Sequence, residues 1–290
     1  MIQYFLYKIG MWVAIFLPLK YSYSIAKAVA LLQYYVCFRD RRFVKNNVKA
    51  ILATTDEKII SQKSRLVFIN FAKYLVDFFR FPVIDGEYIS KNVKIEGIKN
   101  LKEAQGLGKG IIAVTAHVGN WELAAVVTAQ LGYQVNAIAL SHKHRRVNEL
   151  FIKQRQMKGV KVVPLGGALR KCFMALKNKE LIGLLGDRDF TGGGIEVEFL
   201  GKMVKIPRGP AIFHLKVGAP LVPSFTIRQP DDSYRIIYEK PIQYNPTGND
   251  EEDMINITKT FLKDVEDVIR RYPEQWFMFR EFWDKAANRV

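Results

Sequence analysis

The stretch Ile111 to Leu131 reads IIAVTAHVGNWELAAVVTAQL and places a histidine between an apolar run of strand character and an apolar run of helical character. Residues 111–116 predict a buried strand, and Asn120 predicts the N-cap of a helix whose first turn contains Glu122. His117 would then lie at the carboxyl end of a strand, where open α/β sheets gather reactive groups. The stretch therefore predicts an α/β fold with a reactive site at this edge.

His117 and Glu122 form a candidate catalytic pair. The glutamate is close enough in sequence to fold back onto the imidazole and keep one ring nitrogen protonated, so that the other nitrogen takes a proton from an alcohol. Such general-base assistance accelerates a reaction by roughly 10²–10⁴. The alternative, which holds for most isolated pairs at this spacing, is a core histidine beside a helix-capping acid. The surrounding sequence decides between the two interpretations.

Four blocks of the chain resemble the late acyltransferases of lipid A biosynthesis, a branch of the lysophospholipid acyltransferase superfamily. In the family's order they are HVGNWE at 117–122, LIGLLGDRDF at 181–190, IPRGPAIFHLKVGAPLVPSF at 206–225 and YPEQWFMF at 272–279. The resemblance implies a membrane-associated enzyme that transfers a fatty acyl chain from acyl carrier protein to a hydroxyl of a lipid A precursor. His117 would be the general base and Glu122 its orienter, and the acyl thioester would be a co-substrate without any further cofactor.

Two alternatives to this function stay open. The first is an acyltransferase that uses another glycolipid or a lysophospholipid as acceptor and acyl-coenzyme A as donor. The second is a catalytically inactive protein that binds membrane surfaces. An α/β-hydrolase with a covalent acyl-serine is not expected, because the chain has no Gly-x-Ser-x-Gly motif. The intact pair of His117 and Glu122 argues against the inactive protein.

The charge balance indicates anionic partners. The net charge is +16, from 44 basic and 28 acidic residues, and such a surface attracts anions. Nucleic acid is not expected, because no recognition motif occurs and the basic residues alternate with long apolar stretches typical of membrane-surface proteins. Anionic lipid, phosphorylated sugar and acidic acyl carrier protein fit better. His142 and His144 lack a third ligand, so no metal site is expected.

Residues 1–50 predict a helical, apolar and basic membrane anchor, and residues 51–290 the acyltransferase domain. The uncharged runs 9–19 and 28–38 are shorter than the ~20 apolar residues that cross a bilayer. Helices lying in the interface, with lysines reaching to the headgroups, are therefore expected at the cytoplasmic face of the bacterial inner membrane. The alternative is a helical cap that buries its apolar face on the domain.

From residue 94 onward, β-rich runs alternate with helical segments and predict a mixed, mostly parallel sheet flanked by helices, as in glycerolipid acyltransferases. Strands are expected at 111–116, 134–140, 160–164, 181–186, 195–199, 220–228 and 233–240. Helices are expected at 120–131, 147–158, 167–178, 208–217 and 251–271. A long helix is expected earlier, at 57–81. Its phenylalanines are either core residues, which is favoured, or an acyl-chain groove or membrane-facing wall: Phe68, Phe71, Phe78 and Phe79.

Further candidates for substrate binding lie at the same edge of the predicted sheet. Asp187 and Asp189 follow the strand 181–186 and match the family's Asp-x-Asp block, which favours a role in positioning the acceptor or a basic partner. An Asp-rich turn capped by Arg188 is the alternative. Asn120 is a candidate because it lies beside the histidine.

Cations form the last group of candidates. Arg145, Arg146 and Arg155 could pair with a substrate phosphate or the thioester oxygen, although a solvated basic helix is equally compatible with them. Arg208 and Gly209 begin a predicted helix and could offer backbone N–H groups to an anion. The family often has Tyr-Arg-Pro after the strand at 134–140, where this chain has Leu-Ser-His. Which cation takes that role is therefore open.

Overall fold

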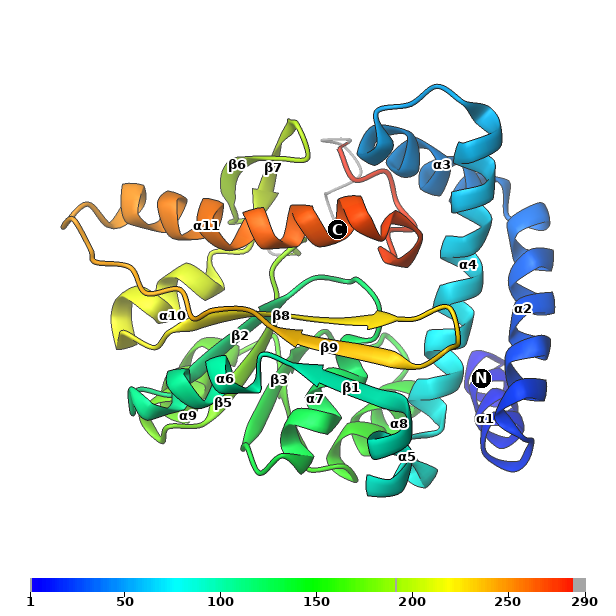
Figure 1. Ribbon diagram of the computed structural model, residues 1–290, viewed down its shortest axis with the longest axis horizontal. Coiled ribbons are helices and arrows are strands. Elements are labelled where there is room, and N and C mark those ends of the chain that lie inside the picture. Colours follow the sequence, from blue (N-terminus) through cyan, green and yellow to red (C-terminus); the bar gives the residue numbers. More distant parts are fainter. Residues whose placement is uncertain (1, 191, 284–290) are drawn as a thin grey trace.

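A seven-stranded sheet forms the centre of the computed structural model, which describes residues 2–190 and 192–283, with the side chains of residues 2 and 3 left aside (Figure 1). The strand order is β1-β9-β8-β2-β5-β3-β4. All neighbours are parallel except β8 and β9, which are antiparallel. The strands are β1 (Val93–Glu96), β2 (Ile111–Thr115), β3 (Val135–Ala139), β4 (Val160–Pro164), β5 (Leu181–Leu185), β8 (Leu221–Arg228) and β9 (Tyr234–Tyr238). The predicted mixed, mostly parallel sheet is confirmed.

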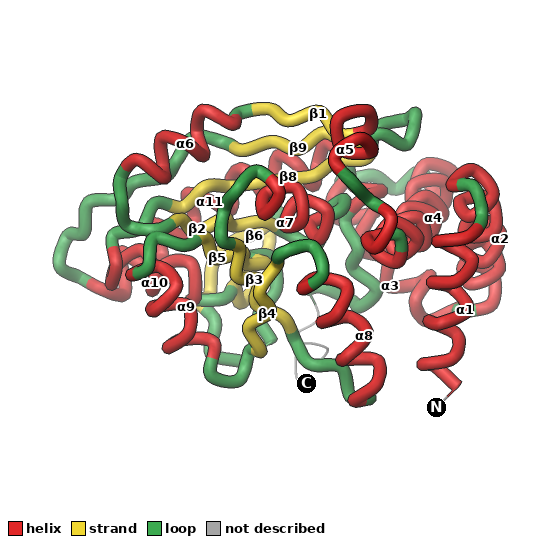
Figure 2. Tube along the Cα trace, turned by 90° about the horizontal axis from the view of Figure 1, so that it is seen from below, coloured by secondary structure: helices red, strands yellow, loops and turns green. Residues whose placement is uncertain are grey.

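Helices cover both faces of the sheet because the strands are apolar on both sides, as in parallel sheets generally. On one face, Ile111 packs with α6 (Ile98–Gly106), α7 (Trp121–Gln130) and α8 (Arg145–Gln156). On the other, Ile112 and Val114 pack with α9 (Ala168–Lys177), α10 (Gly209–Val217) and α11 (Asp250–Arg271). Figure 2 shows α7 and α8 on one side of β2, β5, β3 and β4, and α9 and α10 on the other side. Alternate residues of β2 thus belong to opposite cores.

Asn120 and Asn249 cap α7 and α11 as their sequences suggest. The Asn120 side chain accepts a hydrogen bond from the N–H of Leu123, and that of Asn249 from the N–H of Glu252. Four acids in the first turn of α11 and two arginines in its last turn complement the helix dipole. Both predicted helix starts are thereby confirmed to within a residue.

The differences from the predicted elements lie in short or polar segments. The strand β1, with the sequence VKIE, and the helices α5 (Gly86–Asn92) and α6 were not predicted, because their charged residues obscure any apolar period. The strand β6 (Ile195–Phe199) pairs with the unpredicted β7 (Lys202–Ile206) in a separate antiparallel hairpin. This hairpin stands beside α11 (Figure 1).

The N-terminal helices α1 (Ile2–Phe16), α2 (Leu19–Val36) and α3 (Phe38–Leu52) pack along α4 (Glu57–Phe79). Ala30 of α2 and Val48 of α3 share a buried cluster with Phe68 of α4. In the described residues, no helix combines the length and hydropathy required to cross a membrane. The phenylalanines of α4 are core residues, as favoured: three are buried, and Phe71 packs against Phe277 and Phe279.

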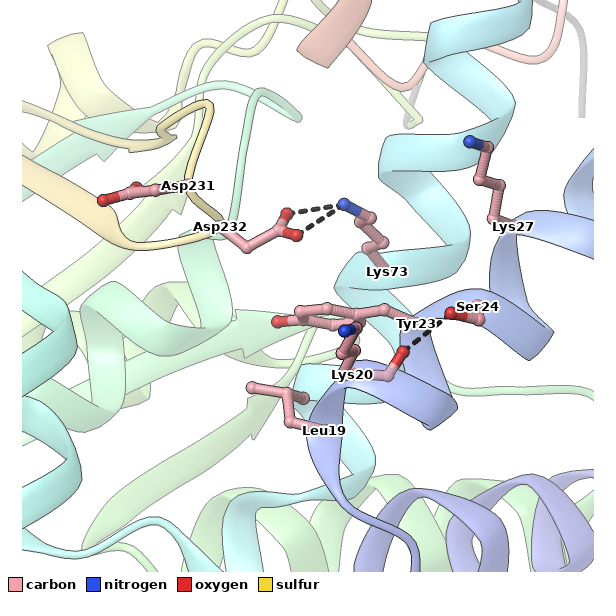
Figure 3. Close-up of a pocket in the computed structure, with 8 residues that line it drawn as sticks. All are labelled: Leu19, Lys20, Tyr23, Ser24, Lys27, Lys73, Asp231 and Asp232. Carbon is pink, nitrogen blue, oxygen red and sulfur yellow. Dashed lines mark hydrogen bonds and ion pairs between the residues drawn. The ribbon is translucent and has the colours of Figure 1, made fainter.

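A buried ionic cluster fastens α2 and α4 to the sheet. Asp77 of α4 pairs with Arg228 of β8, and the hydroxyl groups of Tyr23 and Tyr234 bond to the same carboxylate. Above it, Lys73 binds both carboxylate oxygens of Asp232 at 2.6 and 2.7 Å. A cavity of about 390 Å³ opens here between α2 and the β8–β9 turn (Figure 3). None of its lining residues belongs to the site around His117.

Candidate active site

The loop that carries His117 joins β2 to α7 and is held from two sides. Its histidine carbonyl accepts a hydrogen bond from the N–H of Phe277 at 2.8 Å, and the N–H of Gly119 donates to the Gln275 carbonyl at 2.9 Å. On the other side, the N–H of Asn120 donates to the carbonyl of Thr226 in β8 at 2.9 Å. These bonds fix the position of the reactive histidine.

Gly119 makes this loop possible. Its φ is +62°, and a Cβ there would lie 1.8 Å from the Thr226 carbonyl oxygen. Any other residue would therefore force the loop away from β8.

The imidazole of His117 is bound by Asp187, which follows β5. The distance from His117 Nδ1 to Asp187 Oδ1 is 2.8 Å. The second carboxylate oxygen, Oδ2, accepts from the backbone N–H of His117 at 3.1 Å and from Trp276 Nε1 at 2.9 Å. Because β2 and β5 are parallel neighbours, their carboxyl ends bring the two residues together. Three separate sequence blocks thus meet at one carboxylate.

The protonation states follow from this geometry. Burial opposes ionisation of Asp187, but the charge and hydrogen bond of His117 outweigh it and hold the pKa of Asp187 well below its usual range. A carboxylate only accepts hydrogen bonds, so His117 Nδ1 carries the proton. Burial lowers the pKa of His117 below its ordinary value, against the opposing charge of Asp187. The imidazole is therefore neutral at pH 7, and Nε2 is left as a base.

Glu122 does not hold the imidazole, so the contact expected from the sequence is wrong. Its carboxylate is bound in bidentate fashion by Arg155 of α8, with Nε to Oε2 at 2.7 Å and Nη2 to Oε1 at 2.6 Å. Both side chains are buried, with 7% and 12% of their surfaces exposed. Glu122 raises the pKa of His117 only through its charge, and this effect is the smallest of those that act on the pKa of His117. The pair instead clamps α7 to α8.

The other candidates are divided between the site and the periphery. Asp189 accepts a hydrogen bond from the N–H of Gly194 at 2.9 Å. Arg145 is exposed and pairs with Glu149 one turn along α8, and Arg146 is exposed beside it. Asn120 is buried, and its amide also donates to Tyr234. The charge of Arg155 is taken by the buried Glu122, which corrects its expected role as a free cation for substrate.

Arg208 and Gly209 lie where the sequence placed them, at the start of α10. No side chain caps this helix, and Pro210 at its second position has no N–H to offer. Their expected contact with an anion stays a prediction.

Aromatic residues surround the reactive imidazole. The ring of Trp121 lies 5.2 Å from that of His117, and the ring of Phe190 lies 6.4 Å away. Trp121 in turn stacks on Tyr74 of α4 at 4.7 Å. The imidazole keeps 13% of its surface exposed, so it is accessible from one side and otherwise enclosed. An oriented neutral histidine in such a setting is suited to deprotonating a hydroxyl.

The sequence did not point to Trp276 and Phe190 as parts of the site. Trp276 lies within the Pro-Glu-Gln-aromatic block, and Phe190 ends the block around Asp187. The available signal was the family resemblance of the two blocks that contain them. Blocks that resemble one family and follow its order tend to lie close together in the folded protein.

Neutralising Glu122 should destabilise the fold more than it affects the imidazole. Glu122→Gln leaves the buried guanidinium of Arg155 without its counterion, which should cost about 3 kcal/mol or more of unfolding free energy. Denaturant unfolding monitored by circular dichroism measures this loss. Glu149→Gln, which removes the matching acid of the exposed pair on α8, should leave the unfolding midpoint unchanged. Equal midpoints for both variants would show that the buried pair has no structural role.

Comparison with known proteins places these observations in a family. The family described as bacterial lipid A biosynthesis acyltransferase matches residues 1–285. A phosphatidylinositol mannoside acyltransferase of Mycolicibacterium smegmatis is 25% identical over 244 residues, which cover 83% of this chain and 78% of that protein. A protein of the same description from Mycobacterium tuberculosis strain H37Rv is 30% identical over 161 residues, covering 53% of this chain and 51% of that protein.

Proposed function

The chain belongs to the bacterial lipid A biosynthesis acyltransferase family, and from this premise we propose that it transfers a fatty acyl chain from a thioester to a hydroxyl group of a glycolipid. The family description and the names of the mycobacterial relatives both refer to glycosylated lipids. The acceptor is therefore proposed as a class, with lipid A precursors and phosphatidylinositol mannosides as its two members.

The contact between His117 and Asp187 carries the proposal. In the reaction, the acceptor hydroxyl gives its proton to His117 Nε2 while its oxygen attacks the thioester carbonyl carbon. The carbon–sulfur bond then breaks, and the imidazolium returns the proton to the departing thiolate. Asp187 holds Nδ1–H and stabilises the imidazolium, as the third member of a triad does. No covalent acyl-enzyme is required.

The test of this function is the lipid profile of cells that express the protein. Expression in a bacterium that lacks its own related acyltransferase should produce a glycolipid heavier by one acyl chain, detected by mass spectrometry. Expression of His117→Ala to the same level should not. Fragmentation of the new species identifies the sugar position that received the chain. Unchanged lipids with well-folded protein would count against the proposal.

Membrane association is proposed through the outer surface of α1 and α2. Apolar residues recur there at helical spacing and stay exposed: Phe5, Leu6, Ile9, Trp12 and Phe16 on α1, and Tyr21, Ile25, Val29, Leu32, Tyr35 and Val36 on α2. Lys8, Lys20 and Lys27 are exposed on the same helices. Apolar patches bordered by lysines fit the interface of an anionic bilayer. We propose that the protein binds the cytoplasmic face of the bacterial inner membrane.

Removing two side chains of this surface should weaken binding to vesicles. Trp12 and Phe16 are 59% and 67% exposed, and each would contribute about 1.5 kcal/mol or more on full burial in lipid. The double change to serine should therefore lower the partition coefficient for anionic vesicles about tenfold or more in a sedimentation assay. The matched control is Leu169→Ser with Met174→Ser, which removes two exposed apolar residues of α9. Equal losses in the two variants would mean that binding does not use α1.

Acyl carrier protein is proposed as the donor because it is acidic and this chain carries a net charge of +16. Steered docking weakens as salt shortens the Debye length from ~10 Å at 0.1 M to ~3 Å at 1 M. The kcat/KM for acyl carrier protein thioester should therefore fall steeply with salt, while the rate with the same acyl chain on coenzyme A should be lower and less sensitive. The acceptor is kept in the same detergent dispersion at every salt concentration, so that only the reaction with the donor varies. Equal rates and slopes would favour coenzyme A.

A further inference from the structure

Among the residues that the structure describes, two arginines beside the reactive histidine have no acidic partner. Arg188 follows Asp187 at the end of β5, and Arg280 follows η2 (Pro273–Gln275) near the end of the described chain. Their guanidinium carbons lie 5.2 and 5.7 Å from the centre of the Phe190 ring. Within residues 2–190 and 192–283, neither guanidinium forms an ion pair, and the buried Nε of Arg188 has no hydrogen-bond partner.

These two half-buried arginines differ from the two arginines that pair with buried acids. Arg155 is neutralised by Glu122, and Arg228 by Asp77. The acid whose charge acts on Arg188 is its neighbour Asp187, and the oxygens of Asp187 already accept hydrogen bonds from His117 and Trp276. A buried cation without a dedicated counterion is costly.

The charges of Arg188 and Arg280 also favour an anion between them. Burial lowers the pKa of Arg188, Asp187 opposes this effect, and the charge of Arg280 lowers the pKa further. The two guanidinium groups therefore repel each other at this position. An anion between them would relieve the repulsion.

We propose that Arg188 and Arg280 form a subsite for a phosphate group of the substrate. A planar guanidinium that lies against an aromatic ring keeps its N–H groups directed for bidentate binding of phosphate. The inference rests on the proposed function, and it specifies the substrate as a lipid that carries phosphate close to the hydroxyl to be acylated.

The position of the subsite favours the acceptor over the donor as the source of the phosphate. Phe190, which both arginines contact, lies 6.4 Å from the His117 ring. A phosphate bound here would be near the reacting hydroxyl, as it is in a phosphorylated sugar or in a glycosylated phosphodiester lipid. In coenzyme A and acyl carrier protein, a long diamide arm separates the phosphate from the thioester, so that phosphate would lie farther away.

Binding measurements test the subsite without any turnover. Glycerophosphoinositol serves as a phosphodiester headgroup without acyl chains, and phosphopantetheine is compared with pantetheine for the donor. Calorimetric titration should show glycerophosphoinositol binding to the wild type and about tenfold weaker binding to Arg188→Gln and to Arg280→Gln, because charge-assisted hydrogen bonds are lost. Arg188→Lys keeps the charge, so its affinity for glycerophosphoinositol should lie between those of the wild type and Arg188→Gln. Lys177→Gln, an exposed change at the opposite edge of the sheet, should bind like the wild type.

The possible outcomes separate the alternatives. If only phosphopantetheine loses affinity in the two glutamine variants, the subsite exists and belongs to the donor. If neither phosphate compound binds more weakly to correctly folded variants, the proposal is wrong. In the acyl transfer assay, the acceptor KM should rise about tenfold in each glutamine variant while the donor KM stays constant. Phosphate binding without acyl transfer would refute the proposed function and leave the subsite intact.

Discussion

His117→Ala should lower the rate of acyl transfer by about 10²–10⁴ while the protein stays folded. The change removes the base that takes the proton of the acceptor hydroxyl, so the attacking oxygen must react as an alcohol. The imidazole is partly exposed, at 13% of its surface, and lies at the rim of the core beside Asp187, Trp121 and Phe190, so little packing is lost. Single-turnover kinetics with a radiolabelled acyl thioester and a dispersed glycolipid measure the chemical step directly.

The control for this experiment is His144→Ala, which removes an exposed histidine at the start of α8 whose side chain caps nothing. It should retain the wild-type rate. A nearly normal rate for folded His117→Ala would exclude this histidine as the base and with it the proposed mechanism.

The place of the reactive histidine could be predicted from sequence, because it depends on local signals. An apolar strand and an N-capping asparagine within ten residues determine where the strand ends and where the helix begins. The same stretch lies in the structure with β2 ending at Thr115 and α7 beginning at Trp121.

The partner of the histidine could not be predicted in the same way. Glu122 is five residues away, whereas Asp187 is seventy residues away and comes close only because β5 is inserted next to β2. Periodicity shows that both strands exist but not which strands are neighbours. Proximity in sequence therefore favoured the wrong carboxylate, since Arg155 had no visible relation to Glu122.

The arginines illustrate the same limit. Arg145 and Arg146 attract attention because basic residues cluster in that segment, yet the structure leaves both exposed on α8. Arg188 lies in the block at 181–190 and Arg280 directly follows the block at 272–279, and both contact the ring of Phe190. Which arginines lie close together at the site depends on the fold, and the order of residues along the chain does not show it.

The N-terminal helices fit both interpretations that their sequence allowed. Ala14, Ala30 and Tyr34 are buried against the body of the protein, as a helical cap would require. The opposite surface, with Trp12 and Phe16, stays apolar and exposed. In the sequence, lysines divide the N-terminal segment into short apolar runs. This pattern does not show which face of each helix packs against the rest of the protein.

Asp187→Asn should reduce acyl transfer by about 10²–10⁴, comparable to loss of the histidine, although the change replaces only one oxygen with an amide nitrogen. The amide can donate to His117 Nδ1 and thereby place the imidazole proton on Nε2, where it blocks the base. In other triads the same substitution lowers kcat by ~10⁴ for this reason. Asp250→Asn, an exposed change at the start of α11, is the matched control and should have no effect.

The pH profile separates this role from a structural one. Activity requires neutral His117, and burial lowers its pKa, so the wild-type rate should fall only at pH values below the ordinary value of about 6.5. Asp187 opposes that lowering; without its charge the pKa falls further, and the acid limb of kcat/KM should move to still lower pH on a reduced plateau. A residue that merely supports the fold would lower the plateau and leave the limb in place. An acid limb that stays fixed or moves upward in folded Asp187→Asn would therefore show that this carboxylate does not act on the imidazole.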